Sequence, residues 1–110
     1  MNAATGRKGV VAACEIRLTV LGHKKAMNRF HRSQWERWLK ARNCTLLQDT
    51  SERFACLFET RTVPLTGLER LSRASPALVF LLDYELPKKR MKGLVVFRAG
   101  RSPSHQVTNY

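Results

Sequence analysis

The order of strand-like and helix-like segments in this 110-residue chain predicts a single α+β domain. A segment of period-two alternation is followed by an amphipathic helix, a hairpin, a short helix and an apolar strand. This is the order βαββαβ, and one extra strand follows it. An antiparallel sheet with two helices on one face is the ferredoxin-like plan. We expect that domain at residues 13–100, between a flexible basic arm at residues 1–12 and a polar, mobile tail at residues 101–110.

The first strand and the first helix have the most regular patterns. Residues 14–21 alternate between apolar and polar side chains, as in a strand with one buried face, and Gly22 ends this segment. A helix is predicted over residues 24–42, with Asn43 as its stop. The side of this helix that would face the core carries Met27, Phe30, Trp35, Trp38 and Leu39.

A hairpin and a short helix are expected next. Residues 44–48 and 53–60 flank a segment rich in turn formers, which is typical of two strands joined by a turn. Thr66 and Glu69 have the T-x-x-E spacing of a capping box, so the second helix should begin there. Pro76 should end it.

Two strands complete the predicted domain. Residues 78–85 begin with side chains that are apolar on both faces, which indicates a central strand of the sheet. Residues 94–98 are expected to be its hairpin partner, and the connection between them, residues 86–93, is strongly basic.

The C-terminal half has a pattern that resembles the YubB-type ferredoxin-like domain. The residues that carry the resemblance are Pro64, Leu68–Ser72, Pro76–Glu85, Gly93 and Arg98–Gly100. The opening strand that ends at Gly22 and the helix that contains Phe30 also fit, so the resemblance covers about residues 15–100. It implies a ferredoxin-like fold and an origin in a plasmid, phage or other mobile element, and it implies no particular activity.

Charge is the main indication of a partner. Twenty Lys and Arg face eight Asp and Glu, so the net charge is +12. Such a field attracts polyanions over about a Debye length, ~8–10 Å at physiological salt. The expected partner is therefore the phosphate backbone of DNA or RNA, or else an acidic surface of a host protein complex.

The densest group of cations lies in the connection between the last two strands. Four cations at a hairpin tip would grip phosphates, and the polar face of the first helix would add a second line of charge. The predicted nucleic-acid-binding residues are Lys88, Lys89, Arg90 and Lys92 in the hairpin, Arg98 and Arg101 beyond its second strand, and Lys25, Arg29 and Arg32 on the helix. Lys40 lies on the same polar face of the predicted helix. The alternative is that these side chains are simply solvated at the surface and contact no partner.

Aromatic residues offer a second possibility for base contact. Residues 53–58 faintly resemble the RNP1 strand of RNA-recognition motifs, but they lack its glycine, so Phe54 and Phe58 are expected in the core. Trp35 and Trp38 are also predicted to be core residues because they align with the apolar side of the helix. Stacking on bases, or filling a pocket of a partner, is the alternative for both tryptophans.

No catalytic centre is predicted, and neither is a metal or cofactor site. The three histidines are scattered, and His31 is expected in a half-buried structural position. Asp83 and Glu85 are interpreted as surface ion pairs with the nearby Lys88 and Lys89. The chain has none of the G-x-x-x-x-G-K-[ST], G-x-S-x-G and H-E-x-x-H motifs.

Cysteine usage and hydropathy predict a cytoplasmic location. Cys14, Cys44 and Cys56 show neither a disulfide framework nor metal-ligand spacing, and Cys14 and Cys56 are expected in the core. No secretory signal or membrane span is recognised, and no membrane contact is expected.

Together these patterns predict a non-enzymatic, sequence-tolerant nucleic-acid-binding accessory protein of a mobile element. The alternative is a phage- or plasmid-encoded inhibitor, of the anti-CRISPR kind, that binds a host defence complex. The same cations would then meet carboxylates and accelerate encounter.

Overall fold

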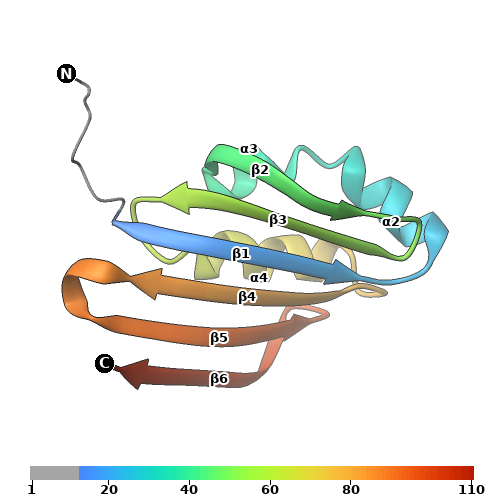
Figure 1. Cartoon of the computed structure of the whole chain (residues 1–110). Helices are drawn as coiled ribbons and strands as arrows, with labels where there is room; N and C mark the ends of the chain where they lie inside the picture. The colour runs from blue at the N-terminus through green and yellow to red at the C-terminus, as the bar shows by residue number, and fades with distance from the viewer. Residues whose placement is uncertain (1–12) are drawn as a thin grey trace.

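The computed structural model describes residues 13–110, which form a six-stranded antiparallel sheet with helices over one face (Figure 1). The strands are β1 Cys14–Leu21, β2 Arg42–Asp49, β3 Arg53–Thr60, β4 Val79–Leu86, β5 Met91–Arg98 and β6 Arg101–Asn109. Their order across the sheet is β2-β3-β1-β4-β5-β6. The helices are α2 Lys24–His31, α3 Trp35–Leu39 and α4 Leu65–Ala74, with a 3-10 turn η1 at Pro87–Lys89. The α+β class is confirmed, whereas the arm predicted at residues 1–12 lies outside the described residues.

Alternation along the strands divides the sheet into a buried face and an open face. On β1, Ile16 and Leu18 are buried, whereas Glu15 and Arg17 are exposed. The residues of β3 and β4 that pair with Leu18 are buried as well. Helices cover the buried face, and the other face, which we call the open face, has no helix of residues 13–110 over it (Figure 1).

The predicted single helix at residues 24–42 is wrong, because the chain forms two short helices there. Gln34 adopts a left-handed conformation with φ of 58° between α2 and α3. The hydroxyl of Ser33 donates to the carbonyl oxygen of Phe30. This hydrogen bond uses an acceptor that a continuing helix would offer to a backbone N–H group one turn later. The break brings the ring of Trp35 back over that of Phe30, with centroids 5.8 Å apart and an interplanar angle of 16°. Asn43 does not end the helix but lies in β2.

The predicted β2–β3 hairpin is confirmed, and so is the central position of β4, which lies between β1 and β5. The predicted capping box at α4 is wrong. Helix α4 begins directly after Pro64, and no side chain caps its amino end. Glu69 instead accepts a hydrogen bond from Arg73 one turn later, at 2.6 Å. The helix ends before Pro76, as expected.

The predicted mobile tail is the second large correction. Residues 101–109 form the edge strand β6, which is antiparallel to β5 over its whole length. Their sequence lacks apolar alternation, so the strand depends on backbone pairing and on Tyr84, whose hydroxyl lies 2.8 Å from Nε2 of His105. Pro103 is tolerated because β6 is the last strand of the sheet.

Most of the predicted core residues are buried. Phe30, Trp35, Phe54 and Phe58 pack together, and Cys14 and Cys56 are buried as free thiols. Trp38 differs from this prediction, because 43% of it is exposed. Among the helices of residues 13–110, none has the length and apolar character that a membrane span requires.

Candidate nucleic-acid interface

Seven of the nine predicted phosphate contacts lie at two opposite ends of the sheet, whereas Arg29 and Arg32 lie at the carboxyl end of α2. We call the end at which β3 and β4 finish the hairpin end, and the other the turn end (Figure 1). Lys88–Lys92 lie at the hairpin end, whereas Lys25, Arg98 and Arg101 lie at the turn end. Lys92 and Arg98 lie six residues apart on β5, which is about 20 Å along the strand. The expectation that Arg98 and Arg101 extend the hairpin patch is therefore wrong.

The hairpin between β4 and β5 presents fewer free cations than its sequence suggests. Arg90 has a left-handed backbone with φ of 51°, and its Nε donates to the carbonyl oxygen of Tyr110 at 2.8 Å. The guanidinium carbon of Arg90 lies 5.9 Å from the centroid of the Tyr110 ring, and Nζ of Lys92 lies 5.8 Å from it. Lys88 and Lys89 remain fully available at the surface.

The acidic residues near this hairpin do not neutralise it as predicted. Within residues 13–110 the ion pair between side chains of fixed charge is Glu69–Arg73, and Nε2 of His31 contacts Asp49, so the expected pairs of Asp83 and Glu85 with the hairpin lysines do not form. Glu85 instead accepts a hydrogen bond from the Tyr110 hydroxyl.

A second group of cations surrounds a cleft of about 1030 Å³ at the same hairpin end. We call it the basic cleft. It lies between α3, the start of β2, the loop from β3 to α4, and the amino end of α4. Its lining contains five cations and no carboxylate: Arg37, Lys40, Arg42, Arg61 and Arg70. The other lining residues are polar, apolar or glycine, and Trp38 is the largest of them.

Close contact between α3 and α4 shapes the basic cleft. A Cβ at Gly67 would lie 2.4 Å from the carbonyl oxygen of Trp38, so only glycine allows this approach of the two backbones. Trp35 and Leu39, four residues apart, anchor α3 in the core. Trp38 therefore lies on the flank of this short helix, where it borders the cleft.

The cations of the basic cleft are not balanced by the protein itself. In the described part of the chain, no ion pair within 4 Å involves a cleft residue. Arg37 donates to the side-chain oxygen of Gln34 at 3.2 Å, which orients its guanidinium without neutralising it. An anion in the cleft would thus meet several unpaired positive charges.

The open face has the opposite character. Glu59, Glu15 and Glu85 occupy one row across β3, β1 and β4, because Glu15 pairs with both of the others. A hollow of about 390 Å³ on this face is lined by Glu15, Asp83 and Glu85 together with Arg17 and Lys92. Phe54 and Phe58 are buried on the other face, so the RNP1-like strand offers no aromatic platform here. Polyanions are therefore favoured at the basic cleft, on the helix-covered side of the hairpin end, rather than on the open face.

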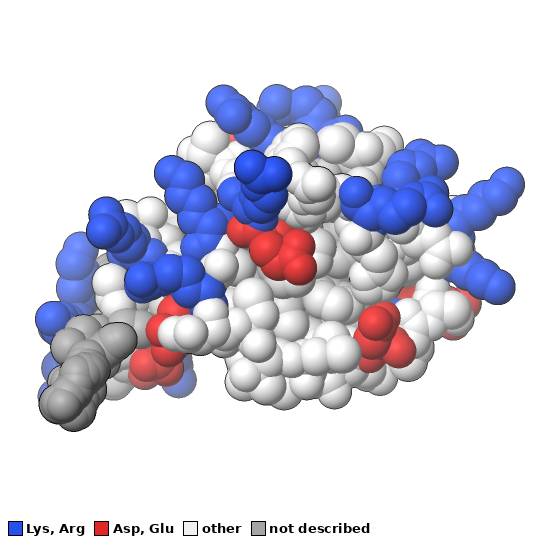
Figure 2. All heavy atoms as spheres, turned by 90° about the horizontal axis from the view of Figure 1, so that it is seen from above, with Lys and Arg blue, Asp and Glu red and all other residues white. Residues whose placement is uncertain are grey.

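Figure 2 shows how the charges spread over one face of the molecule. Lys and Arg side chains form several groups, and uncharged surface separates them. The cations therefore do not form one continuous stripe on this face.

Of the five cleft cations, the sequence indicated only Lys40, as part of the polar face of the predicted helix, and it indicated none of Arg37, Arg42, Arg61 and Arg70. They come from α3, β2, the β3–α4 loop and α4, and only folding brings them together. Because they are scattered in the sequence, no local run of charge indicates them. The exposed Trp38 was recognised, but its helical spacing was interpreted as that of a core residue.

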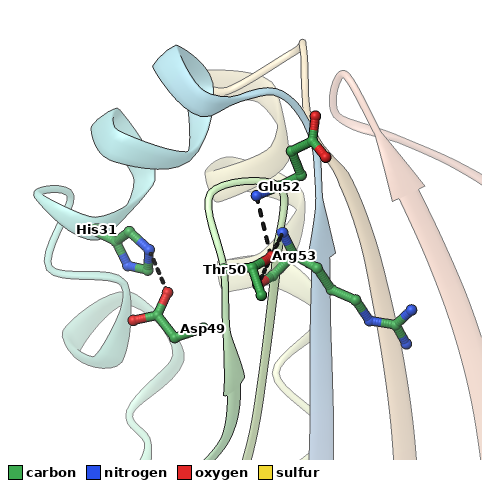
Figure 3. A network of polar contacts seen from close by, with 5 residues as sticks. All are labelled: His31, Asp49, Thr50, Glu52 and Arg53. Atoms are coloured by element: carbon green, nitrogen blue, oxygen red, sulfur yellow. Dashed lines mark hydrogen bonds and ion pairs between the residues drawn. The ribbon is translucent and has the colours of Figure 1, made fainter.

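His31 has the structural role expected of it. Its Nε2 lies 3.2 Å from a carboxylate oxygen of Asp49 (Figure 3), and its ring packs edge-on against Phe54. The adjoining turn is closed by Thr50, whose hydroxyl oxygen accepts from the backbone N–H groups of Glu52 and Arg53 (Figure 3). Within residues 13–110, no group of three His, Cys, Asp or Glu is placed to hold a metal ion.

Trp38 and the surrounding cations thus make the basic cleft the candidate site of this protein. Comparison with family models, with curated proteins and with solved structures finds no match for the chain.

Proposed function

We propose that this is a non-enzymatic nucleic-acid-binding accessory protein that contacts phosphates with the hairpin end of its sheet. The observation that carries the proposal is the basic cleft, where five cations and no carboxylate line one concavity. Lys88 and Lys89 lie at the same end of the sheet and would extend the contact. No base-specific contact is proposed, so binding should tolerate many sequences.

The fold and the origin of the protein belong to the same proposal. The order β2-β3-β1-β4 with its helices fits the ferredoxin-like plan, to which β5 and β6 are added. The resemblance to the YubB-type domain supports an origin in a mobile element. The three free cysteines support a reducing, cytoplasmic location.

The dependence of binding on salt tests the proposed function. If the five cleft cations and the two hairpin lysines each neutralise one phosphate of a single strand, log K should fall against log salt with a slope of about −4.9. Fluorescence anisotropy of labelled oligonucleotides between about 0.05 and 0.2 M salt measures this slope. Absence of binding at the lowest salt would refute the proposal.

A protein partner is the second candidate function, and the exposed edge strand β2 favours it. All residues of β2 are exposed, including Leu46 at 59% and Leu47 at 45%. An edge strand offers unpaired backbone groups to a strand of another protein. Such a partner should be captured from nuclease-treated host lysate by the wild type and lost on Leu46→Glu. Capture that survives Leu46→Glu would exclude this edge as the contact.

A further inference from the structure

The geometry points to a specific use of the basic cleft: it holds one unstacked base of a single-stranded nucleic acid against Trp38, while the cleft cations contact the flanking phosphates. This inference rests on the proposed function and adds the type of strand and the way in which it is held. It assigns Trp38, Arg61 and Arg70 to a site, and none of them was indicated by the charge pattern of the sequence.

Exposure of Trp38 is the first argument. Helix α3 has five residues, and it buries Trp35 and Leu39 while 43% of Trp38 remains exposed. Because α3 is already anchored, the core does not explain a large aromatic residue at position 38. A base can stack on an indole whatever its identity, which suits sequence-tolerant binding.

The surroundings of Trp38 supply the second argument. Arg37, Lys40 and Arg42 follow one another around the end of α3 and the start of β2, and Arg61 and Arg70 line the same cleft from the β3–α4 loop and α4. Each nucleotide joins an aromatic base to phosphates on either side. The combination of one exposed aromatic residue and several unpaired cations in one concavity matches that chemistry.

The shape of the site favours a single strand over a duplex. Bases inside a duplex are stacked on their neighbours and cannot reach an indole at the border of a cleft. The volume of about 1030 Å³ is just above the range of small-ligand pockets, about 300–1,000 Å³, so an unstacked nucleotide can enter. A duplex would contact only the cations at the rim.

An acidic peptide is the less favoured ligand. Carboxylates would use the cations of the cleft, but they would leave the indole of Trp38 without a flat partner. A nucleotide unit therefore fits the basic cleft better than an acidic peptide does, and competition by an acidic peptide is one of the outcomes of the test.

The experiment compares the affinity of variants for three labelled probes, each of about 12 nucleotides: oligo(dT), oligo(rU) and a DNA duplex. Trp38→Ala should weaken binding of the single strands by about 5- to 150-fold, the range that loss of one stacked base gives. It should leave duplex affinity nearly unchanged. Trp38→Phe should restore most of the single-strand affinity, because it keeps an aromatic face. Unchanged single-strand affinity in Trp38→Ala would overturn the inference.

A matched pair of charge variants locates the site. Arg61→Ala/Arg70→Ala removes two positive charges from the basic cleft, and Lys88→Ala/Lys89→Ala removes two from the hairpin. The cleft pair should weaken single-strand binding more than the hairpin pair does. Equal losses would show that only total charge matters and would overturn the assignment to the cleft.

Tryptophan emission gives a readout independent of the labels. Only the exposed Trp38 should be quenched by oligo(dT), and quenching should disappear in Trp38→Phe, which retains the buried Trp35. Circular dichroism of each variant verifies that it folds. If oligoglutamate competes with oligo(dT) as effectively as unlabelled oligo(dT) does, the ligand class is wrong. If the wild type binds none of the nucleic acids, the proposed function itself fails, whereas binding that is independent of Trp38 removes only this inference.

Discussion

The hydroxyl of Tyr84 lies 2.8 Å from Nε2 of His105, although strand β5 runs between the strands of these two residues. Gly93 of β5 makes the contact possible, since a Cβ there would lie 2.3 Å from Cζ of Tyr84. The Tyr84 side chain therefore crosses β5 where β5 has no side chain. This arrangement ties three strands together and holds the polar strand β6 on the sheet.

Gly93→Ala should destabilise the protein by about 1–3 kcal/mol, because the new methyl group and the Tyr84 ring occupy the same space. Urea unfolding monitored by circular dichroism measures the loss. Tyr84→Phe should cost less, about 0.5–1.5 kcal/mol, because it removes only the hydrogen bond. In the Gly93→Ala background, Tyr84→Leu should lower the free energy of unfolding by less than the same substitution lowers it in the wild type. Independent, additive effects would contradict the proposed crossing.

Gly67→Ala should weaken both stability and oligonucleotide binding. Its Cβ would meet the backbone carbonyl oxygen of Trp38 at 2.4 Å, and backbone cannot rotate away as a flexible side chain can. We expect α3 to shift and the basic cleft to change shape. Thermal unfolding and anisotropy with oligo(dT) measure the two effects. Thr66→Ala, next to it and exposed, is the matched control for stability, which it should leave unchanged; because Thr66 also lines the basic cleft, it is not a control for binding. A similar loss of stability in both variants would argue against backbone contact as the cause.

The salt dependence of single-strand binding tests whether the hairpin end of the sheet contacts the strand while the turn end does not. Lys88→Ala/Lys89→Ala should reduce the steepness of the single-strand salt slope by about 1.4, as loss of two phosphate contacts requires. Arg98→Ala/Arg101→Ala carries the same change of charge at the turn end and should leave the slope nearly unchanged. A slope that changes equally in both variants would mean that the bound strand reaches both ends.

Cys56 should make the protein sensitive to alkaline conditions. Burial, with smaller contributions from the charges of Cys44 and Glu36, raises the pKa of the Cys56 thiol from its ordinary value of 9.0 to about 12. Between these values the folded state binds more protons than the unfolded state, so the free energy of unfolding falls as pH rises. Below pH 9 this contribution is fully present.

The measurement is the difference in unfolding free energy between wild type and Cys56→Ala at a series of pH values. It should be constant below about pH 9 and shrink toward pH 12. A difference that stays constant over the alkaline range would show that the thiol does not titrate in this way. The exposed Cys44 should react first with a thiol reagent in the folded protein.

Strong local patterns in the sequence predicted the central part of the fold. Alternation predicted β1, turn formers predicted the hairpin of β2 and β3, and an apolar run predicted the central strand β4. These signals succeeded because each is a direct consequence of burial on one or both faces of a sheet.

The errors arose where a contact distant in sequence determines the local structure. The chain breaks after α2 because Trp35 stacks on Phe30, although the helical period continues through the break. Strand β6 has no strand pattern of its own and depends on β5 and on Tyr84. Both features become visible only when the partner residues are known to be close in space.

The candidate site illustrates the same limit for function. A dense run of Lys and Arg indicated the hairpin, yet Tyr110 engages two of its cations. The basic cleft collects residues from four separate segments, each with one or a few cations. The density of charge along the sequence therefore predicted the hairpin cations as site residues. The cations of the basic cleft can be recognised as one group only when the fold is known.

The exposed strand β2 has a practical consequence for handling the protein. Mutual repulsion between highly charged copies hinders them from joining edge to edge, and added electrolyte weakens that repulsion. A concentrated salt wash, used to strip polyanions from a purified sample, would therefore also promote self-association through Leu46 and Leu47. Preparations should become turbid in strong electrolyte sooner than those of a Leu46→Lys variant.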